Sequence, residues 1–455
     1  MAGIEGAAWL LAAATRELTL FAAVGLLIGG IDDLAVDAIW LGRTAWRRLT
    51  VYRRHPRTNA ETLPPPDRPG RIALFVPAWQ ESAVIGDMVR AALGSIAHGD
   101  YRIYVGTYPN DPATIAVVEA VGDPRVRLVR GDRPGPTTKA ECLNRMWAAL
   151  LRDERGAGAR FKAVVLHDAE DVVHPQELRL FDRLIERFDL VQLPVLPLVD
   201  DGSRWVSGHY VDEFAEAHGR QLAVREALGA GIPSAGVGCA IARAALARMA
   251  GAADGRPFDE DSLTEDYEIG LRLTNFGGRA AFVAMPACAG GPLVATRAYF
   301  PHTLATSVRQ KTRWMIGIAC AGWDRLRWQG GLAERWMLLR DRRAVLAAVI
   351  LAAAYAAMAL SGLCWVMGVE VAWPRGLGTM LAFNFGLLAW RLAIRFVTVA
   401  RFYGWREGCR AVPRVLTANV IAMMAARRAL AAYVPGRVNR WDKTAHHFPT
   451  APSCD

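Results

Sequence analysis

The stretch that decides the fold is Ala163-Val164-Val165-Leu166-His167-Asp168-Ala169-Glu170-Asp171. Its first four residues are continuously apolar, which is typical of a strand buried on both faces of a sheet. In open α/β sheets the ligand site lies at the carboxyl ends of the strands, so the acidic residues that follow stand where a ligand binds. Three carboxylates within four residues repel one another unless a cation or hydrogen-bond donors neutralise them. Mg²⁺ or Mn²⁺ prefers such oxygen ligands together with substrate phosphates. The alternative is an acidic loop that caps a helix beginning near residues 175–177.

Strand patterns alternate with helical patterns around this stretch. We expect further strands at 72–76, 101–105 and 126–129, and helices at 82–96 and 139–151. Continuous apolar strands separated by helices indicate a mostly parallel sheet covered on both faces. The predicted fold class is therefore α/β.

Composition indicates a membrane protein with a reduced, cytosolic soluble part. The 455 residues have room for two or three domains, and 53% of them are hydrophobic. The net charge of +10 comes from Arg clusters beside apolar segments, as the positive-inside rule expects. No basic patch interleaved with aromatics occurs in the soluble core, so we expect no nucleic-acid partner. The seven cysteines show no CxxC spacing, which argues against a disulfide framework or a zinc site.

Three apolar segments are long enough to span a bilayer. Residues 7–31 form the first, and the basic stretch 43–57 that follows it is expected in the cytosol. Residues 345–369 and 377–399 form a hairpin whose two outer flanks are both rich in Arg. Residues 415–433 are interrupted by polar side chains, so we predict an interfacial amphipathic helix there, with a fourth span as the alternative. The tail 441–449 would then be cytosolic.

Three other motifs carry candidate chemistry. Thr264-Glu265-Asp266-Tyr267 places a carboxylate where it could act as a general base, although a helix N-cap explains the same pattern. In Arg309-Gln310-Lys311-Thr312-Arg313-Trp314, a guanidinium and an indole could hold a sugar diphosphate and stack on a sugar ring. Snorkelling and aromatic anchoring at the bilayer are the alternative for this run. Pro77-Ala78-Trp79-Gln80-Glu81 ends the first strand, where turns commonly touch a nucleotide. Lys139, at the start of a helix, could bind phosphate or only solvate the surface.

The order of these motifs along the chain is more specific than any one of them. The sequence reads PAWQE, KAECLN, HDAED, SAGVGCA, TED and RQKTRW between an N-terminal apolar segment and a C-terminal hairpin. In this order the chain resembles a membrane-bound family 2 glycosyltransferase of the GT-A fold, over roughly residues 70–330 and the flanking helices. YVGTYPND, the HDAED form and the WDKTAHHFP tail look like the branch named for phage adsorption protein B.

The resemblance implies roles for individual residues. Asp168 and Glu170, with Asp171 adjacent, would hold Mg²⁺ or Mn²⁺ and the nucleotide diphosphate. Asp266 would be the general base, with Glu265 beside it. Gln310, Arg313 and Trp314 would grip the diphosphate and border the acceptor. Pro77 and Glu81 would begin the nucleotide pocket, with Lys139 beneath it, and residues 236–239 would form a loop near the acceptor.

The resemblance also implies an activity and a location. The expected enzyme is an inverting hexosyl- or N-acetylhexosaminyl-transferase that uses a nucleotide-diphosphate sugar, a UDP-sugar, on a glycan acceptor to build a cell-surface polysaccharide. It would lie in the bacterial inner membrane as a multi-pass protein with a cytosolic catalytic domain. Transfer of one sugar to a lipid phosphate carrier, and a non-catalytic scaffold for phage adsorption, are the alternatives. Three spans are few for a polymer channel, so an outer-membrane or periplasmic export partner is expected.

Two departures from the family pattern bear on this expectation. The paired Asp residues that usually contact the nucleobase are replaced by Gly106-Thr107-Tyr108, which puts uracil recognition in doubt. Some relatives carry a further cyclic di-GMP-binding domain, so control of that kind is expected from a separate subunit. The expected regions are an N-terminal transmembrane helix (1–42), a basic and Pro-rich linker (43–70), the GT-A domain (71–300), the QxxRW segment with interfacial helices (301–343), the transmembrane hairpin (344–400), and an interfacial helix with the tail (401–455).

Overall fold

A computed structural model describes residues 2–433 and 447–449. Of the tail 441–449, therefore, residues 441–446 lie outside the described residues. The soluble domain is built on a seven-stranded sheet of order β3-β2-β1-β4-β6-β5-β7. The strands are β1 (Ile72–Pro77), β2 (Tyr101–Thr107), β3 (Val126–Arg130), β4 (Ala163–Leu166), β5 (Leu190–Gln192), β6 (Cys239–Ala242) and β7 (Ala280–Phe282). β6 runs antiparallel to β4 and β5, and the other pairings are parallel. The predicted α/β class with a mostly parallel sheet is confirmed.

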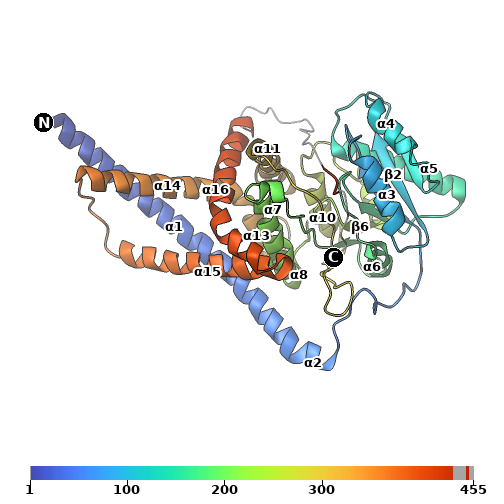
Figure 1. Cartoon of the computed structure of the whole chain (residues 1–455), viewed down its shortest axis with the longest axis horizontal. Coiled ribbons are helices and arrows are strands. Elements are labelled where there is room, and N and C mark those ends of the chain that lie inside the picture. Colours follow the sequence, from blue (N-terminus) through green and yellow to red (C-terminus); the bar gives the residue numbers. More distant parts are fainter. Residues whose placement is uncertain (1, 434–446, 450–455) are drawn as a thin grey trace.

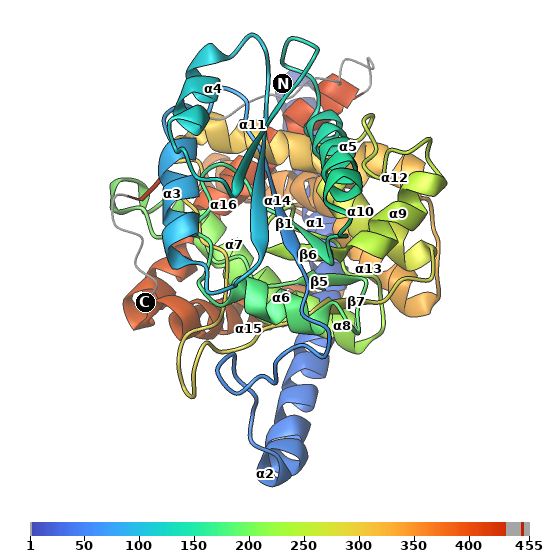
Figure 2. The same ribbon diagram turned by 90° about the vertical axis from the view of Figure 1, so that its right-hand side faces the viewer.

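Both faces of the sheet are buried because successive residues of each strand point to opposite sides. In β1, Ile72, Leu74 and Val76 pack with one group of helices, while Ala73 and Phe75 pack with another. The first group is α3 (Ile85–Ser95), α4 (Pro112–Glu119) and α6 (Glu177–Leu184). The second is α5 (Lys139–Ala157), α9 (Arg243–Gly251) and α10 (Glu265–Asn275). Figure 2 shows α3 and α5 on opposite sides of the sheet.

Among the described residues, four helices are long and apolar enough to cross a membrane: α1 (Ala2–Trp46), α14 (Ala344–Met367), α15 (Leu377–Tyr403) and α16 (Trp405–Tyr433). The first of these candidate spans runs on to Arg54, through the π-helical turn η1 (Arg47–Val51) and α2 (Tyr52–Arg54). In Figure 1, α1, α14 and α15 extend away from the sheet, while α16 runs across them beside the soluble domain. This orientation supports the interfacial prediction for α16, although its length and composition also permit a span.

The N-terminal helix does not end where its apolar run ends. Helix α1 continues from residue 31 to Trp46 because the acidic residues that follow find cationic partners. Asp32 and Asp33 pair with Arg343 at 2.6 Å each. The Pro-rich segment after α2, which was expected to be a linker, packs in part against the soluble domain. Ala60 and Leu63 are buried in the core of the soluble domain, and Ala60 N–H donates to the carbonyl of Pro286 at 2.8 Å.

Shorter helices join the sheet domain to the candidate membrane-spanning helices. They are η2 (Asp201–Ser203), α7 (Gly208–Glu216), η3 (Ala217–Gln221), α8 (Leu222–Ala227), α11 (Leu304–Met315), η4 (Ile316–Cys320), α12 (Ala321–Leu326) and α13 (Leu332–Arg342). Helix α7 is the main anchor. Its fully buried Asp212 accepts from Arg414 of α16 at 2.7 Å and 3.0 Å. Its Glu216 accepts from Arg391 and Arg395 of α15 at 2.7 and 3.2 Å. Buried charges need such partners, so these pairs fix the domain on the helices.

Candidate active site

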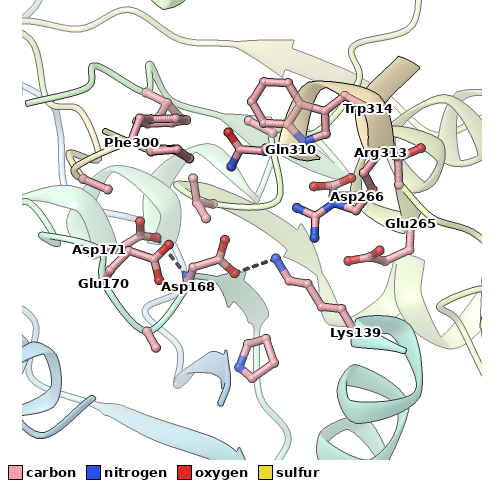
Figure 3. A pocket seen from close by; sticks show the side chains of 18 of the residues that line it. Lys139, Asp168, Glu170, Asp171, Glu265, Asp266, Phe300, Gln310, Arg313 and Trp314 are labelled. Carbon is pink, nitrogen blue, oxygen red and sulfur yellow. Dashed lines mark hydrogen bonds and ion pairs between the residues drawn. The ribbon is translucent and has the colours of Figure 1, made fainter. Parts of the chain in front are cut away.

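One cavity opens at the carboxyl ends of β1 and β4, and the predicted catalytic, nucleotide-binding and metal-binding residues all line it. Pro77 is the last residue of β1, and the acidic loop follows β4 directly. The predicted site residues that line the cavity are Pro77, Glu81, Lys139, Asp168, Glu170, Asp171, Glu265, Asp266, Gln310, Arg313 and Trp314. Figure 3 shows Asp168 directed at Lys139, with Asp266 and Glu265 near Arg313 and with Gln310 and Trp314 close by. Segments up to 237 residues apart in sequence therefore meet in one place.

The acidic loop after β4 uses its third carboxylate for its own structure. Asp171 accepts hydrogen bonds from the backbone N–H of Asp168 and from His167 Nδ1, both at 2.9 Å. His167 Nε2 lies 2.7 Å from Glu177, and all three side chains are buried. Burial alone would lower the pKa of His167, but the two carboxylates outweigh it and raise that pKa to about 10. A protonated His167 therefore donates from both ring nitrogens, and Asp171 is committed to the loop.

All three predicted metal ligands line the cavity, but their surroundings differ. Asp171 Oδ2 is taken up by His167 and by the backbone of the loop, whereas Asp168 pairs with Lys139. We therefore propose Asp168 and Glu170 as the main metal ligands of the three. Within residues 2–433 and 447–449, no group of three His, Cys, Asp or Glu side chains could by itself hold a metal ion. Mg²⁺ is commonly held by only one or two carboxylates plus substrate phosphates, so this pair of side chains fits such an ion.

Lys139 is the cation at the centre of the site. It opens α5, where the hydroxyl of Thr138 caps the helix by accepting from Glu141 N–H at 3.2 Å. Its Nζ donates to Asp168 Oδ1 at 2.6 Å. Burial would lower the pKa of Lys139, but the charges of Asp168, Glu265 and Asp266 raise it overall. Lys139 is therefore a permanent positive charge between the acidic loop and the start of α10.

The carboxylates of Glu265 and Asp266 stand in the first turn of α10. Asp266 Oδ1 accepts from Tyr267 N–H at 2.7 Å, whereas Glu265 Oε1 is buried without a hydrogen-bond partner. Burial and the charge of Asp266 raise the pKa of Glu265 to about 8, and burial also raises that of Asp266. Lys139 and Arg313 oppose both shifts. We infer that the pair holds one proton near neutral pH. Thr264 stands at the N-cap position of α10, as the alternative reading of the motif expected, but its hydroxyl makes no cap hydrogen bond.

A glycine holds the backbone against the Asp266 carboxylate. Gly236 has φ of +77°, and a Cβ placed there would lie 3.0 Å from Asp266 Cβ and closer still to Oδ2. Gly238 has φ of +57°, and a Cβ there would collide with the hydroxyl of Thr296. The expected loop near the acceptor therefore packs directly on the candidate base.

Helix α11 forms the opposite wall of the cavity. Gln310, Arg313 and Trp314 stand three and four residues apart, so they share one face of the helix, and all three line the cavity. The Trp314 ring meets Tyr210 edge-on at 6.0 Å and Phe214 at 6.2 Å between centroids. Membrane anchoring does not explain this motif, because the indole is in the cavity wall.

Sequence reasoning missed the apolar part of the lining. The further lining residues are Thr138, Ala169, Val195, Phe214, Ala235, Val237, Ser262, Leu263, Thr264, Ala298, Tyr299, Phe300 and Pro301. Aromatic residues such as Phe214, Tyr299 and Phe300 belong to no charged motif and read as ordinary core. Only the fold, which places them around the cavity, marks them as cavity residues.

The mixed sheet and the acidic cavity at the ends of its strands define a GT-A-type fold. Residues 69–317 match the model of the family described as glycosyltransferase like family 2. The chain belongs to this family and carries a family 2 glycosyltransferase domain, as the motif order predicted.

Known proteins extend this assignment. Bacteriophage adsorption protein B of Escherichia coli K12 and bacteriophage N4 adsorption protein B of E. coli O157:H7 are each 39% identical over 477 residues. Each match covers 98% of this chain and 63% of the relative, so the chain spans less than two thirds of the length of these curated relatives. The predicted branch is confirmed. A solved mannosyltransferase of Pyrobaculum calidifontis, in complex with GDP-Man and Mn²⁺, has a TM-score of 0.52 and 17% identity. That match covers 89% of this chain and 99% of the other, and it shows a shared fold.

Proposed function

We propose that this protein transfers a sugar from a nucleotide-diphosphate donor to an acceptor hydroxyl, with inversion at the anomeric carbon, to extend a cell-surface polysaccharide. The observation that carries the proposal is the meeting of two carboxylate sites, Asp168/Glu170 and Glu265/Asp266, around one buried lysine. A glycosidase would need two carboxyl groups on opposite sides of one glycosidic bond. Carboxylates grouped around cations suit instead a substrate that itself carries a diphosphate.

Asp266 is the proposed general base. As the acceptor hydroxyl oxygen bonds to the anomeric carbon, Asp266 takes the hydroxyl proton, and the bond from that carbon to the diphosphate oxygen breaks. Lys139 and Arg313 balance the charge that grows on the departing diphosphate, in a site where buried charges interact strongly. Mg²⁺ or Mn²⁺, held by Asp168 and Glu170, would supply further neutralisation of the diphosphate.

The acceptor is proposed to lie against the wall formed by Gln310 and Trp314. This wall is close to the membrane helices, because Leu263 lines the cavity and also packs with the cluster that joins α11 to α16. The basic flanks of the spans support a cytosolic catalytic domain in a bacterial inner membrane. Export partners and a separate cyclic di-GMP-binding subunit remain proposals that rest on the family resemblance.

A second acceptor class is favoured by the same position of Leu263. A cavity beside an interfacial helix could receive a lipid phosphate carrier as well as a growing glycan. The two are separated by extracting the radioactive product, since a lipid-linked sugar partitions into organic solvent and a polysaccharide does not.

Purified full-length protein in detergent with Mn²⁺ should release a nucleoside diphosphate from at least one donor in a panel of UDP- and GDP-sugars. Asp266→Asn should lower this release by about 100- to 10,000-fold, the usual contribution of a general base. Asp261→Asn is the matched control, because Asp261 is exposed and lies outside the cavity. If the Asp266→Asn variant still releases nucleoside diphosphate at the wild-type rate, Asp266 is not the general base. If no donor turns over but phage adsorption persists in the Asp266→Asn variant, the protein acts as a scaffold.

A further inference from the structure

Tyr267 follows the proposed base directly in α10, but its side chain lies outside the cavity. Asp266 lines the cavity, whereas the Tyr267 ring is buried with Leu271 of α10 and Leu338 of α13. The two neighbours are also joined through the backbone, because the N–H of Tyr267 donates to Asp266 Oδ1 at 2.7 Å. A shift of Tyr267 would therefore move a hydrogen-bond donor of the proposed base.

A carboxylate of α13 holds the phenol of Tyr267. The phenol donates to Asp341 Oδ2 at 2.6 Å, and Arg225 of α8 donates to the same oxygen at 2.7 Å. Tyr267 and Arg225 are both buried. Burial and the charge of Asp341 raise the pKa of Tyr267 well above its usual value of 10, so the phenol remains a donor near neutral pH. Hydrogen bonds to a carboxylate are stronger than those between neutral groups, so this contact fixes the ring firmly.

The same side chains hold the loop that packs on the proposed base. Arg225 Nε donates to the carbonyl of Gly231, and the N–H of Gly231 donates to Glu334 of α13, both at 2.5 Å. Gly231 begins the segment that leads to Gly236, the glycine whose backbone lies against Asp266. The helix that carries the base and the loop beside it are thus both fastened to α13.

Another face of α13 is fastened to the N-terminal helix. Trp336 Nε1 donates to Asp32 at 2.6 Å, and Arg340 donates to Asp33 at 2.9 Å. Arg343, which ends α13, pairs with both of these carboxylates, and α14 begins at the next residue. Figure 1 shows α13 between α10 and the candidate spans. This short helix therefore connects the spans with the elements around the proposed base.

We propose that Tyr267 and Asp341 are positioning residues for the general base, and that they hold it in register with α13. The inference rests on the proposed function, in which Asp266 takes the proton of the acceptor hydroxyl. Proton transfer requires a base within hydrogen-bond reach of that hydroxyl, so a small displacement of α10 slows the reaction. Neither positioning residue lines the cavity, and their loss should therefore change the rate of transfer rather than the binding of the donor.

A second Tyr-Asp-Arg group in the soluble domain offers a matched comparison. Tyr104 donates to Asp153 Oδ2 at 2.9 Å, and Arg102 donates to the same oxygen at 3.2 Å. The Tyr104 ring is buried as well, and all three residues lie outside the cavity lining. Loss of the Tyr104 phenol removes the same kind of contact at a place that does not touch α10.

The first test is the kinetics of nucleoside diphosphate release by the full chain in detergent. Tyr267→Phe removes one hydroxyl and keeps the ring, and it should lower kcat on the order of 10-fold, since a full 1 Å misplacement costs about 100-fold. The KM for the nucleotide sugar should stay at the wild-type value. Tyr104→Phe should keep both constants. Asp341→Ala should lower kcat at least as much as Tyr267→Phe does, and the double variant should fall no further, because the shared hydrogen bond is already lost.

Hydrogen exchange followed by mass spectrometry adds a reading that is independent of turnover. The amides of residues 264–271 should exchange faster in Tyr267→Phe than in the wild type, and Tyr104→Phe should leave them unchanged. Unchanged exchange in Tyr267→Phe, a wild-type kcat in that variant, or an equal fall of kcat in Tyr104→Phe would each overturn the positioning role, even where Asp266→Asn is inactive. If Asp266→Asn keeps the wild-type rate, or if the wild type releases no nucleoside diphosphate, the proposed function fails first, and the positioning role fails with it.

Discussion

Replacing Gly236 with alanine should disable the site without unfolding the protein. Gly236 stands in the left-handed region at φ +77°, and its Cα faces the carboxylate of Asp266. An alanine side chain there would lie 3.0 Å from Asp266 Cβ and nearer to Oδ2, whereas ordinary Cβ contacts begin near 3.4 Å. The new methyl group therefore pushes directly on the proposed base.

The expected magnitude has two parts. A non-glycine residue in the left-handed region destabilises the fold by about 1–2 kcal/mol. To restore an ordinary contact, the Asp266 carboxylate must retreat by about 1 Å, a displacement that lowers the rate of a positioned reaction on the order of 100-fold. Gly229→Ala is the matched control, because Gly229 has φ of +69° and no atom within 4 Å of its ideal Cβ. It should show the same loss of stability and keep its activity.

The assay is nucleoside diphosphate release, measured together with thermal unfolding for both alanine variants in the same detergent. The expected result is similar melting temperatures and a large difference in turnover. If Gly236→Ala turns over at the wild-type rate, Asp266 is either not the base or not held by this loop. If both variants lose activity equally, backbone strain rather than the contact with Asp266 explains the loss.

Three other outcomes follow from the contacts. Arg414→Met should destabilise the protein by about 3–5 kcal/mol in chemical denaturation, because Asp212 is then a buried charge without its main partner; adding Asp212→Leu should recover much of the loss. Burial raises the pKa of Glu265 to about 8 in the folded protein, whereas the usual value in an unfolded chain is 4.5. Between these two pH values, the folded state holds a proton that the unfolded chain has released. Stability should therefore fall as pH rises from about 4.5 to about 8, and Glu265→Gln should flatten that fall in thermal scans. Glu170→Gln should raise the Mn²⁺ concentration needed for half-maximal activity, while Asp171→Asn should mainly lower stability; the reverse pattern would contradict the proposed ligand assignment.

The strands that bear the site could be predicted because burial on both faces leaves a continuous apolar run. β4 begins and ends at the expected residues, and β1 and β2 are longer than expected by one and two residues. β5, β6 and β7 could not be found in the same way. They are three or four residues long, and Cys239-Ala240-Ile241-Ala242 reads equally well as helix. Their pairing with β4 and with one another identifies them as strands, and that information is not local.

The site was predictable to the extent that its residues are charged. Burying a carboxylate requires a partner, so acidic and basic motifs identify themselves along the chain. Which partner each carboxylate takes was not predictable. Asp171 looked like a metal ligand beside Asp168, and its turn toward His167 depends on Glu177 on the other side of that ring. Phe300 could not be predicted as a site residue at all, because an aromatic residue in a cavity wall has the same sequence signature as one in a hydrophobic core.

Helix α7 explains why the catalytic cavity and the membrane helices must be considered together. Two of its carboxylates, Asp212 and Glu216, hold arginines of α16 and α15. Its other side serves the cavity, because Glu213 pairs with Lys311 of α11 and Phe214 is part of the lining. Lys311 in turn lies 4.9 Å from the centre of the Trp314 ring. One short helix thus sets the distance between the membrane hairpin and the wall proposed to receive the acceptor. A shift of α15 or α16 away from α7 would separate these ion pairs and leave buried carboxylates without partners, which is costly. The cavity wall and the hairpin should therefore move as one body. Under the proposed function, an acceptor at this wall would therefore be held at a fixed depth relative to the bilayer, as the addition of sugars to a membrane-bound product requires.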